Sequence, residues 1–105
     1  MIEQLDVQEL SHWIEAKKTF RLLDVRFSNE KILADIGGML IPLPELEQRW
    51  QEIPEGEGPL IVYCHHGVRS LHACHFLKAQ GIEALNLRGG IDQWSLQVDP
   101  KVPRY

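Results

Sequence analysis

The chain has 105 residues, of which 44% are hydrophobic and 25% are charged, so we expect one globular domain over residues 1–105. Its net charge of −4 lacks the basic excess of a nucleic-acid-binding protein, and no apolar stretch approaches the roughly 20 residues that cross a bilayer. The first residues do not form a secretion signal, so we expect a cytoplasmic protein that binds neither nucleic acid nor a membrane.

The N-terminal part of the chain predicts a helix followed by a strand. Residues 7–17 carry apolar side chains at helical spacing, and Asp6 with Glu9 forms a capping pair. The segment "FRLLDVR" (residues 20–26) is a short strand that ends on a charged pair, Asp24 and Arg26.

Two short elements and a helix follow. "SNEKILA" (residues 28–34) predicts a helix capped by Ser28, and "GGMLIPL" (residues 37–43) predicts a second strand. Pro44 can then occupy the first turn of a helix. That helix should present four apolar residues on one side: Leu43, Leu46, Trp50 and Ile53.

The second half of the chain contains the most strand-like segment, "PLIVYC" (residues 59–64), which is apolar throughout as in a strand covered on both faces. "RSLHACHFLKAQG" (residues 69–81) predicts a helix, "IEALNL" (residues 82–87) the last strand, and "RGGIDQWSL" (residues 88–96) a final short helix. The small and apolar residues of the first of these helices form a stripe suited to packing on a sheet: Ser70, Ala73, Cys74 and Leu77.

This alternation of strands and helices indicates an α/β fold with a mostly parallel sheet. Ligands of such sheets bind beyond the carboxyl ends of the strands. The segment "CHHGVRS" (residues 64–70) lies at such an end and leads directly into a predicted helix. We therefore expect the functional site in this segment.

The chemistry of this loop points to a nucleophilic cysteine. Backbone N–H groups at the start of a helix attract anions, and the same field should favour the thiolate form of Cys64. Gly67 lets the backbone curl, Arg69 can brace the loop or bind an anion, and Ser70 can donate to the thiolate or cap the helix. Four residues separate Cys64 from Arg69, a ring that suits a sulfur atom on Cys64 better than a phosphoryl group.

Several motifs together resemble the rhodanese-like sulfurtransferase domain. They are "LLDVR", "GGMLIPL", "IVYCHHGVRS" and "LRGGIDQW", and the resemblance extends from about Ile2 to Trp94. It implies a three-layer α/β sandwich around a mostly parallel five-stranded sheet, with helices on both faces. It further implies that Cys64 carries a persulfide within a cradle formed by residues 65–69. Where some members have an arginine or lysine early in this loop, the present chain has His65 and His66.

We therefore predict a sulfurtransferase that moves sulfane sulfur from thiosulfate or a persulfide to a thiol, cyanide or a protein of a sulfur relay. The predicted site comprises the nucleophile with its loop and a supporting ion pair. These residues are Cys64, His65, His66, Gly67, Val68, Arg69, Ser70, Asp24 and Arg26. The alternatives are a non-catalytic rhodanese-like binding module and, disfavoured by the short ring, a cysteine-dependent phosphatase or arsenate reductase.

No metal or organic cofactor is expected. Cysteines and histidines do cluster in this region, which could suggest a zinc site. However, the side chains of neighbouring His65 and His66 should point apart, and the sequence lacks the paired Cys-x-x-Cys motifs of zinc sites. His72 and His75 are interpreted as solvated helix residues. Cys74 could be a resolving thiol for Cys64, but its place on the apolar stripe favours a small core residue.

Overall fold

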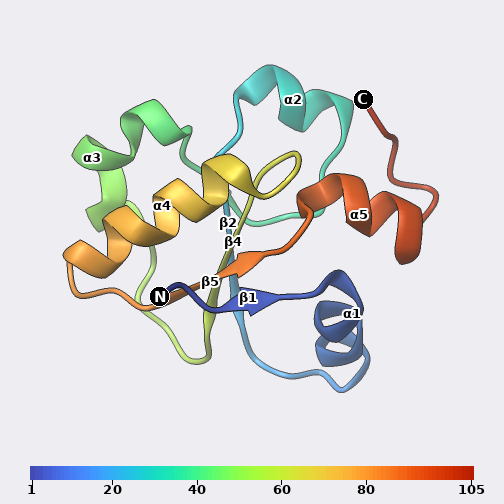
Figure 1. The fold of residues 1–105 in the computed structure, drawn as a ribbon, viewed down its shortest axis with the longest axis horizontal. Coiled ribbons are helices and arrows are strands. Elements are labelled where there is room, and N and C mark those ends of the chain that lie inside the picture. The colour runs from blue at the N-terminus through green and yellow to red at the C-terminus, as the bar shows by residue number, and fades with distance from the viewer.

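A computed structural model describes residues 1–105 and has a five-stranded sheet in the order β1-β5-β4-β2-β3, with every pair of neighbouring strands parallel (Figure 1). The strands are β1 (Gln4–Leu5), β2 (Arg21–Asp24), β3 (Met39–Leu40), β4 (Leu60–Tyr63) and β5 (Ala84–Leu87). The helices are α1 (Val7–Glu15), α2 (Ser28–Leu33), α3 (Leu46–Arg49), α4 (Val68–Ala79) and α5 (Gly90–Gln97). Two 3₁₀ turns, Leu43–Glu45 and Trp50–Glu52, flank α3. The predicted fold class is confirmed.

The sheet separates two apolar cores because side chains alternate along each strand. In β4, Leu60 and Val62 face one core and Ile61 and Tyr63 face the other, and all four are buried. The first core packs against the predicted stripe of α4 and against α3, and the second packs against α1 and α5. Both faces of the sheet are therefore covered, and α4 and α5 approach the carboxyl end of β4 from opposite sides (Figure 1).

Three local predictions are wrong. The first helix ends at Glu15 rather than Lys17, and Asp6 at its N-cap makes no capping hydrogen bond, because its carboxylate accepts from Arg88 at 3.2 Å. Ser28 is not a cap either: Phe27 occupies that position, and its N–H donates to the Glu30 carboxylate at 3.3 Å. At Asp6 a long-range partner, Arg88, binds the carboxylate that local rules assign to capping, whereas at the second helix the cap lies one residue before the predicted Ser28.

Two further differences concern segments around the sheet. The predicted helix after Pro44 is divided into α3 and two 3₁₀ turns, although its four apolar residues do pack on one core. The edge strand β1 was not predicted, because it has only two residues and pairs through its backbone with β5. None of the helices combines the length and the apolar character that a membrane span requires.

Candidate active site

Cys64 lies at the carboxyl end of the central strand β4, in the loop that leads into α4. Its Sγ accepts hydrogen bonds from the backbone N–H groups of Gly67 at 3.1 Å and Ser70 at 3.4 Å. The Ser70 hydroxyl lies 3.3 Å from the same sulfur. Cys64 is only 1% exposed, so these groups replace water as the surroundings of the sulfur. The loop therefore holds a thiol among converging donors at a helix N-terminus, as the spacing predicted.

Gly67 is required by the geometry of this loop. It is the N-cap of α4 and has a φ of +98°, in the left-handed region that side chains disfavour. A Cβ at this position would lie 3.1 Å from the backbone nitrogen of Gly89. The turn brings the Gly67 N–H to the sulfur, so a substitution here would move a donor of the site.

The remaining predicted loop residues differ in exposure. Val68 is the first residue of α4 and is 65% exposed, so its side chain takes no part in holding the sulfur. Ser70 is buried, His65 and Arg69 are half-buried, and His66 is exposed. The structure thus brings Gly67 and Ser70 to Cys64 and leaves Val68 at the surface.

Arg69 braces the loop. Its Nη1 and Nη2 donate to the two carboxylate oxygens of Glu30, in α2, at 2.7 and 2.8 Å. This pairing, against partial burial, lowers the pKa of Glu30 to about 2. The fork of the guanidinium is thereby occupied by Glu30, which is the geometry of a brace for the loop. Glu30 was not predicted as a site residue, since nothing in "SNEKILA" distinguishes it from a solvated helix residue.

His65 and His66 do not point apart, which corrects the prediction. Their rings stack with centroids 3.9 Å apart, and the other face of His65 stacks on Tyr105 at 3.9 Å and 9°. Burial is the main cause that lowers the pKa of His65 below its ordinary value, so the neutral form of this ring is favoured. Tyr105 also donates its hydroxyl to Glu30 at 2.8 Å. The C-terminal segment therefore lies against the loop, a placement that a Pro-containing tail does not reveal.

Asp24 and Arg26 form a buried ion pair at the end of β2, next to β4. Arg26 donates through Nε to Asp24 Oδ1 at 2.9 Å and through Nη2 to Oδ2 at 2.8 Å, and both side chains are 0% exposed. A further donor of Arg26 reaches the hydroxyl of Tyr105 at 3.0 Å. The predicted pair is present and connects the second strand to the tail that covers His65.

Asn86 is another site residue that sequence reasoning missed. It lies in β5, is 2% exposed, and accepts a hydrogen bond from the Ser70 hydroxyl at 2.5 Å. Its amide nitrogen donates to the Gly67 carbonyl at 3.0 Å and to Gln4 at 2.9 Å. The only signal was a polar residue inside the apolar strand "IEALNL", which is an indication of a buried hydrogen-bond network.

The outer side of the loop is bound to the start of α5. The N–H groups of Ile91 and Asp92 donate to the carbonyls of Cys64 and His65 at 3.0 and 3.1 Å. Gly90, with a φ of +62°, permits this approach, since a Cβ there would lie 2.5 Å from both carbonyl oxygens. The loop is therefore held from both sides, by α4 at the sulfur and by α5 at the carbonyls.

Cys74 is separate from this chemistry. It is 0% exposed in the core cluster, and burial raises its pKa to about 12. Both cysteines are free, and His72 and His75 are exposed on α4. These positions agree with the interpretation of Cys74 as a core residue.

One group of side chains has the composition of a metal site. Ligand-type atoms of His65, His66 and Asp92 lie within 4.8 Å of one another. However, Arg104 donates to both carboxylate oxygens of Asp92, at 2.8 and 3.3 Å. Both oxygens of the Asp92 carboxylate are therefore already hydrogen-bonded to a guanidinium. The arrangement favours hydrogen bonding over coordination.

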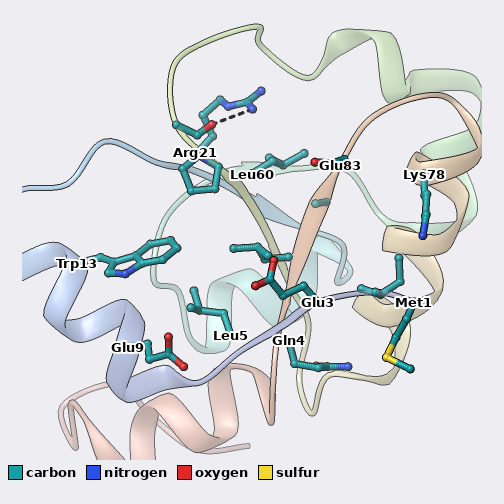
Figure 2. Close-up of a pocket in the computed structure, with 15 residues that line it drawn as sticks. Met1, Glu3, Gln4, Leu5, Glu9, Trp13, Arg21, Leu60, Lys78 and Glu83 are labelled. Carbon is teal, nitrogen blue, oxygen red and sulfur yellow. Dashed lines mark hydrogen bonds between the residues drawn. The ribbon is translucent and has the colours of Figure 1, made fainter.

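A pocket of about 590 Å³ lies at the opposite end of the sheet (Figure 2). Its lining includes the first residues of three strands, Arg21, Leu60 and Ala84, together with Trp13 of α1. Parallel strands present their amino ends there, whereas Cys64 follows the carboxyl end of β4. The pocket and the candidate site are therefore distinct.

These features define a class: a parallel α/β domain that holds a thiol among the N–H groups of a strand-to-helix loop. Residues 6–97 match the family described as Rhodanese-like domain, and the chain belongs to that family. A sulfurtransferase of Allochromatium vinosum is 34% identical over 90% of each chain. A crystal structure of a rhodanese-related protein from Thermoplasma volcanium has a TM-score of 0.80 and 31% identity, covering 91% of this chain and 93% of that one.

Other relatives are longer than this chain. An Arabidopsis thaliana protein described as adenylyltransferase and sulfurtransferase is 29% identical over 97% of this chain, but the match covers 26% of that protein. The family assignment therefore rests on the domain itself. The resemblance inferred from the loop motifs is confirmed.

Proposed function

We propose that this protein is a sulfurtransferase in which Cys64 receives and passes on sulfane sulfur as a persulfide. The observation that carries the proposal is the placement of the Cys64 sulfur between the N–H groups of Gly67 and Ser70, at the N-terminus of α4. A negative charge on sulfur is stabilised by such donors. Relatives named as sulfurtransferases support the reaction class.

The proposed reaction has two displacement steps. The Cys64 thiolate attacks the outer sulfur of the donor. A bond forms between this sulfur and Sγ, the donor's bond to it breaks, and its electron pair leaves with sulfite or a thiolate. An acceptor thiolate then attacks the outer sulfur of the persulfide, and the electron pair of the broken bond returns to Cys64. In both steps the attacking atom and the leaving atom are sulfur, so the electrons balance without a metal or an organic cofactor.

The charges around the loop favour a persulfide over thiosulfate as the donor. Glu30 neutralises Arg69, and burial favours the neutral form of His65, so neither residue offers a free positive charge to a dianion. Cys64 is 1% exposed, which suits a donor that presents its sulfur at the end of a narrow group. We propose a small organic or protein persulfide as donor and a thiol of a small molecule or relay protein as acceptor.

Mass spectrometry after incubation with glutathione persulfide or with thiosulfate tests this proposal. We expect one added sulfur on the peptide containing Cys64, with faster loading from the persulfide at equal concentration. Cys64→Ser should abolish the adduct, whereas the matched variant Cys74→Ser should retain it. If neither donor, nor a cysteine desulfurase with its substrate, loads Cys64, the proposal is wrong.

The same assay separates the donors further through Glu30→Gln, which frees the guanidinium of Arg69. We expect this variant to load relatively faster from thiosulfate than the wild-type protein does, because a free cation then faces the loop. An unchanged ratio of the two loading rates would contradict the charge argument while leaving the sulfurtransferase proposal in place.

A further inference from the structure

The hydrogen bonds behind Cys64 have a direction that is set by Asn86. The Gly67 carbonyl can only accept, so the amide nitrogen of Asn86 must be the group that faces it at 3.0 Å. This orientation turns Asn86 Oδ1 toward Ser70, and that oxygen can only accept. The Ser70 hydroxyl is therefore the donor of the bond to Asn86.

Ser70 has a single hydroxyl proton and two neighbours that compete for it. While this proton points to Asn86, Ser70 offers only a lone pair to the Cys64 sulfur at 3.3 Å. A thiol can donate its own proton to that lone pair, but a thiolate cannot. To stabilise the thiolate, the hydroxyl must rotate toward the sulfur. Asn86 Oδ1 then loses its only hydrogen-bond donor, and because Asn86 is only 2% exposed, water does not replace it.

We infer that Asn86 is a positioning residue for the reaction: by holding the Ser70 proton, it disfavours the bare thiolate of Cys64 relative to the thiol and the persulfide. The inner sulfur of a persulfide carries no charge and accepts hydrogen bonds only weakly, so the loaded state leaves the Ser70 proton on Asn86. Only the bare thiolate draws the proton away. Asn86 thus favours retention of sulfur on Cys64, and this role rests on the sulfurtransferase function proposed above.

Other titratable and charged groups lie in the loop, on the helices next to it and at the neighbouring strand ends, and the test leaves all of them in place. They are His65 and His66 in the loop, Arg69 and Cys74 on α4, Glu30 on α2, Asp92 on α5, and Asp24, Arg26 and Tyr63 at the ends of β2 and β4. None of them bonds to the Ser70 hydroxyl, whose partners are Cys64 and Asn86 alone. A change that depends on both Asn86 and Ser70 is therefore specific to the competition for this proton.

The pH profile of Cys64 alkylation by iodoacetamide, read on the Cys64 peptide by mass spectrometry, measures this competition without any sulfur transfer. Asn86→Ala should shift the profile to lower pH and accelerate alkylation about threefold to tenfold on its acidic side, the range expected for one hydrogen bond. The shift should disappear when Asn86→Ala is combined with Ser70→Ala, which removes the contested proton. Ser95→Ala is the control, because Ser95 is buried but bonds only to Ile91 within α5.

A measurement on the unaltered protein complements the variants. The side-chain carbonyl carbon of Asn86, followed by NMR, should titrate together with Cys64, because the thiolate withdraws the Ser70 proton from Oδ1. A flat Asn86 signal through that titration overturns the inference, as does an alkylation shift of equal size with and without Ser70. Failure of sulfur loading in the unaltered protein would instead contradict the proposed function and leave this result intact.

Discussion

Replacing Asp24 by alanine should be the most destabilising single change at the ion pair beneath the site. Arg26 would then remain buried with hydrogen bonds to the carbonyl of Ala34 at 2.8 Å and to Tyr105 at 3.0 Å, but without a negative partner. Removal of one partner from a buried pair costs about 3–5 kcal/mol. Domains of this size have a total unfolding free energy of about 5–15 kcal/mol, so the loss is at least about a fifth of it.

Urea unfolding followed by tryptophan fluorescence measures this loss directly. We expect a lower midpoint with an unchanged slope, and a melting temperature reduced by about 10–25 °C. The double variant Asp24→Leu with Arg26→Met should be more stable than Asp24→Ala alone, because it removes the unpaired charge. Glu52→Ala, at an exposed ion pair, should leave the midpoint nearly unchanged.

Two results would refute the reasoning. One is an unfolding free energy of Asp24→Ala within about 1 kcal/mol of the wild-type value, which would mean that water or a movement of Arg26 replaces the partner. The other is that Asp24→Leu with Arg26→Met loses as much unfolding free energy as Asp24→Leu and Arg26→Met lose together when each is made alone. Additivity would show that the two side chains do not stabilise each other across the 2.8 Å contact.

Three other predictions concern the surroundings of the loop. Pairing holds the pKa of Glu30 near 2, below its ordinary value of 4.5, so its stabilising effect exists above pH 4.5 and is lost as the pH falls toward 2. In urea titrations at several pH values, Glu30→Gln should therefore be less stable by about 1–2 kcal/mol at pH 7, and a gap that does not narrow below pH 4.5 would contradict the pairing. Gly90→Ala should unfold at markedly lower urea than Gly81→Ala, which has the same left-handed strain but no atom within 4 Å of its added Cβ; equal midpoints would show that the loop can yield. Tyr105→Ala should raise the pKa of His65 in an NMR titration by exposing its ring, whereas Tyr105→Phe should preserve it. Identical curves for the two variants would argue against the stacked tail.

The regular features of this fold could be predicted because they arise from local patterns. The apolar run of β4 and the stripe of α4 carry their own periodicity, and both were placed correctly. The loop was also predictable, since Cys64, Gly67 and Ser70 follow one another at a strand-to-helix junction. The chemistry of a short contiguous segment is visible in a sequence whenever its neighbours in space are also its neighbours in the chain.

The site residues that the sequence did not reveal all act over long range. Asn86 reaches Ser70 from a different strand, Glu30 reaches Arg69 from a different helix, and Tyr105 stacks on His65 from the end of the chain. None of these three residues stands out in its own segment. Their roles depend on which elements the sheet order brings together, which no local pattern specifies.

The attachment of the loop to α5 has a consequence for how such a site can change. The carbonyls of Cys64 and His65 face the first N–H groups of α5, while the later N–H groups of the loop face the sulfur. Inserting a single residue to accommodate a phosphoryl group would therefore widen the ring and also detach it from α5. An engineer who wishes to graft a longer loop must rebuild the beginning of α5 with it. In this scaffold the length of the loop and the position of α5 cannot be changed independently.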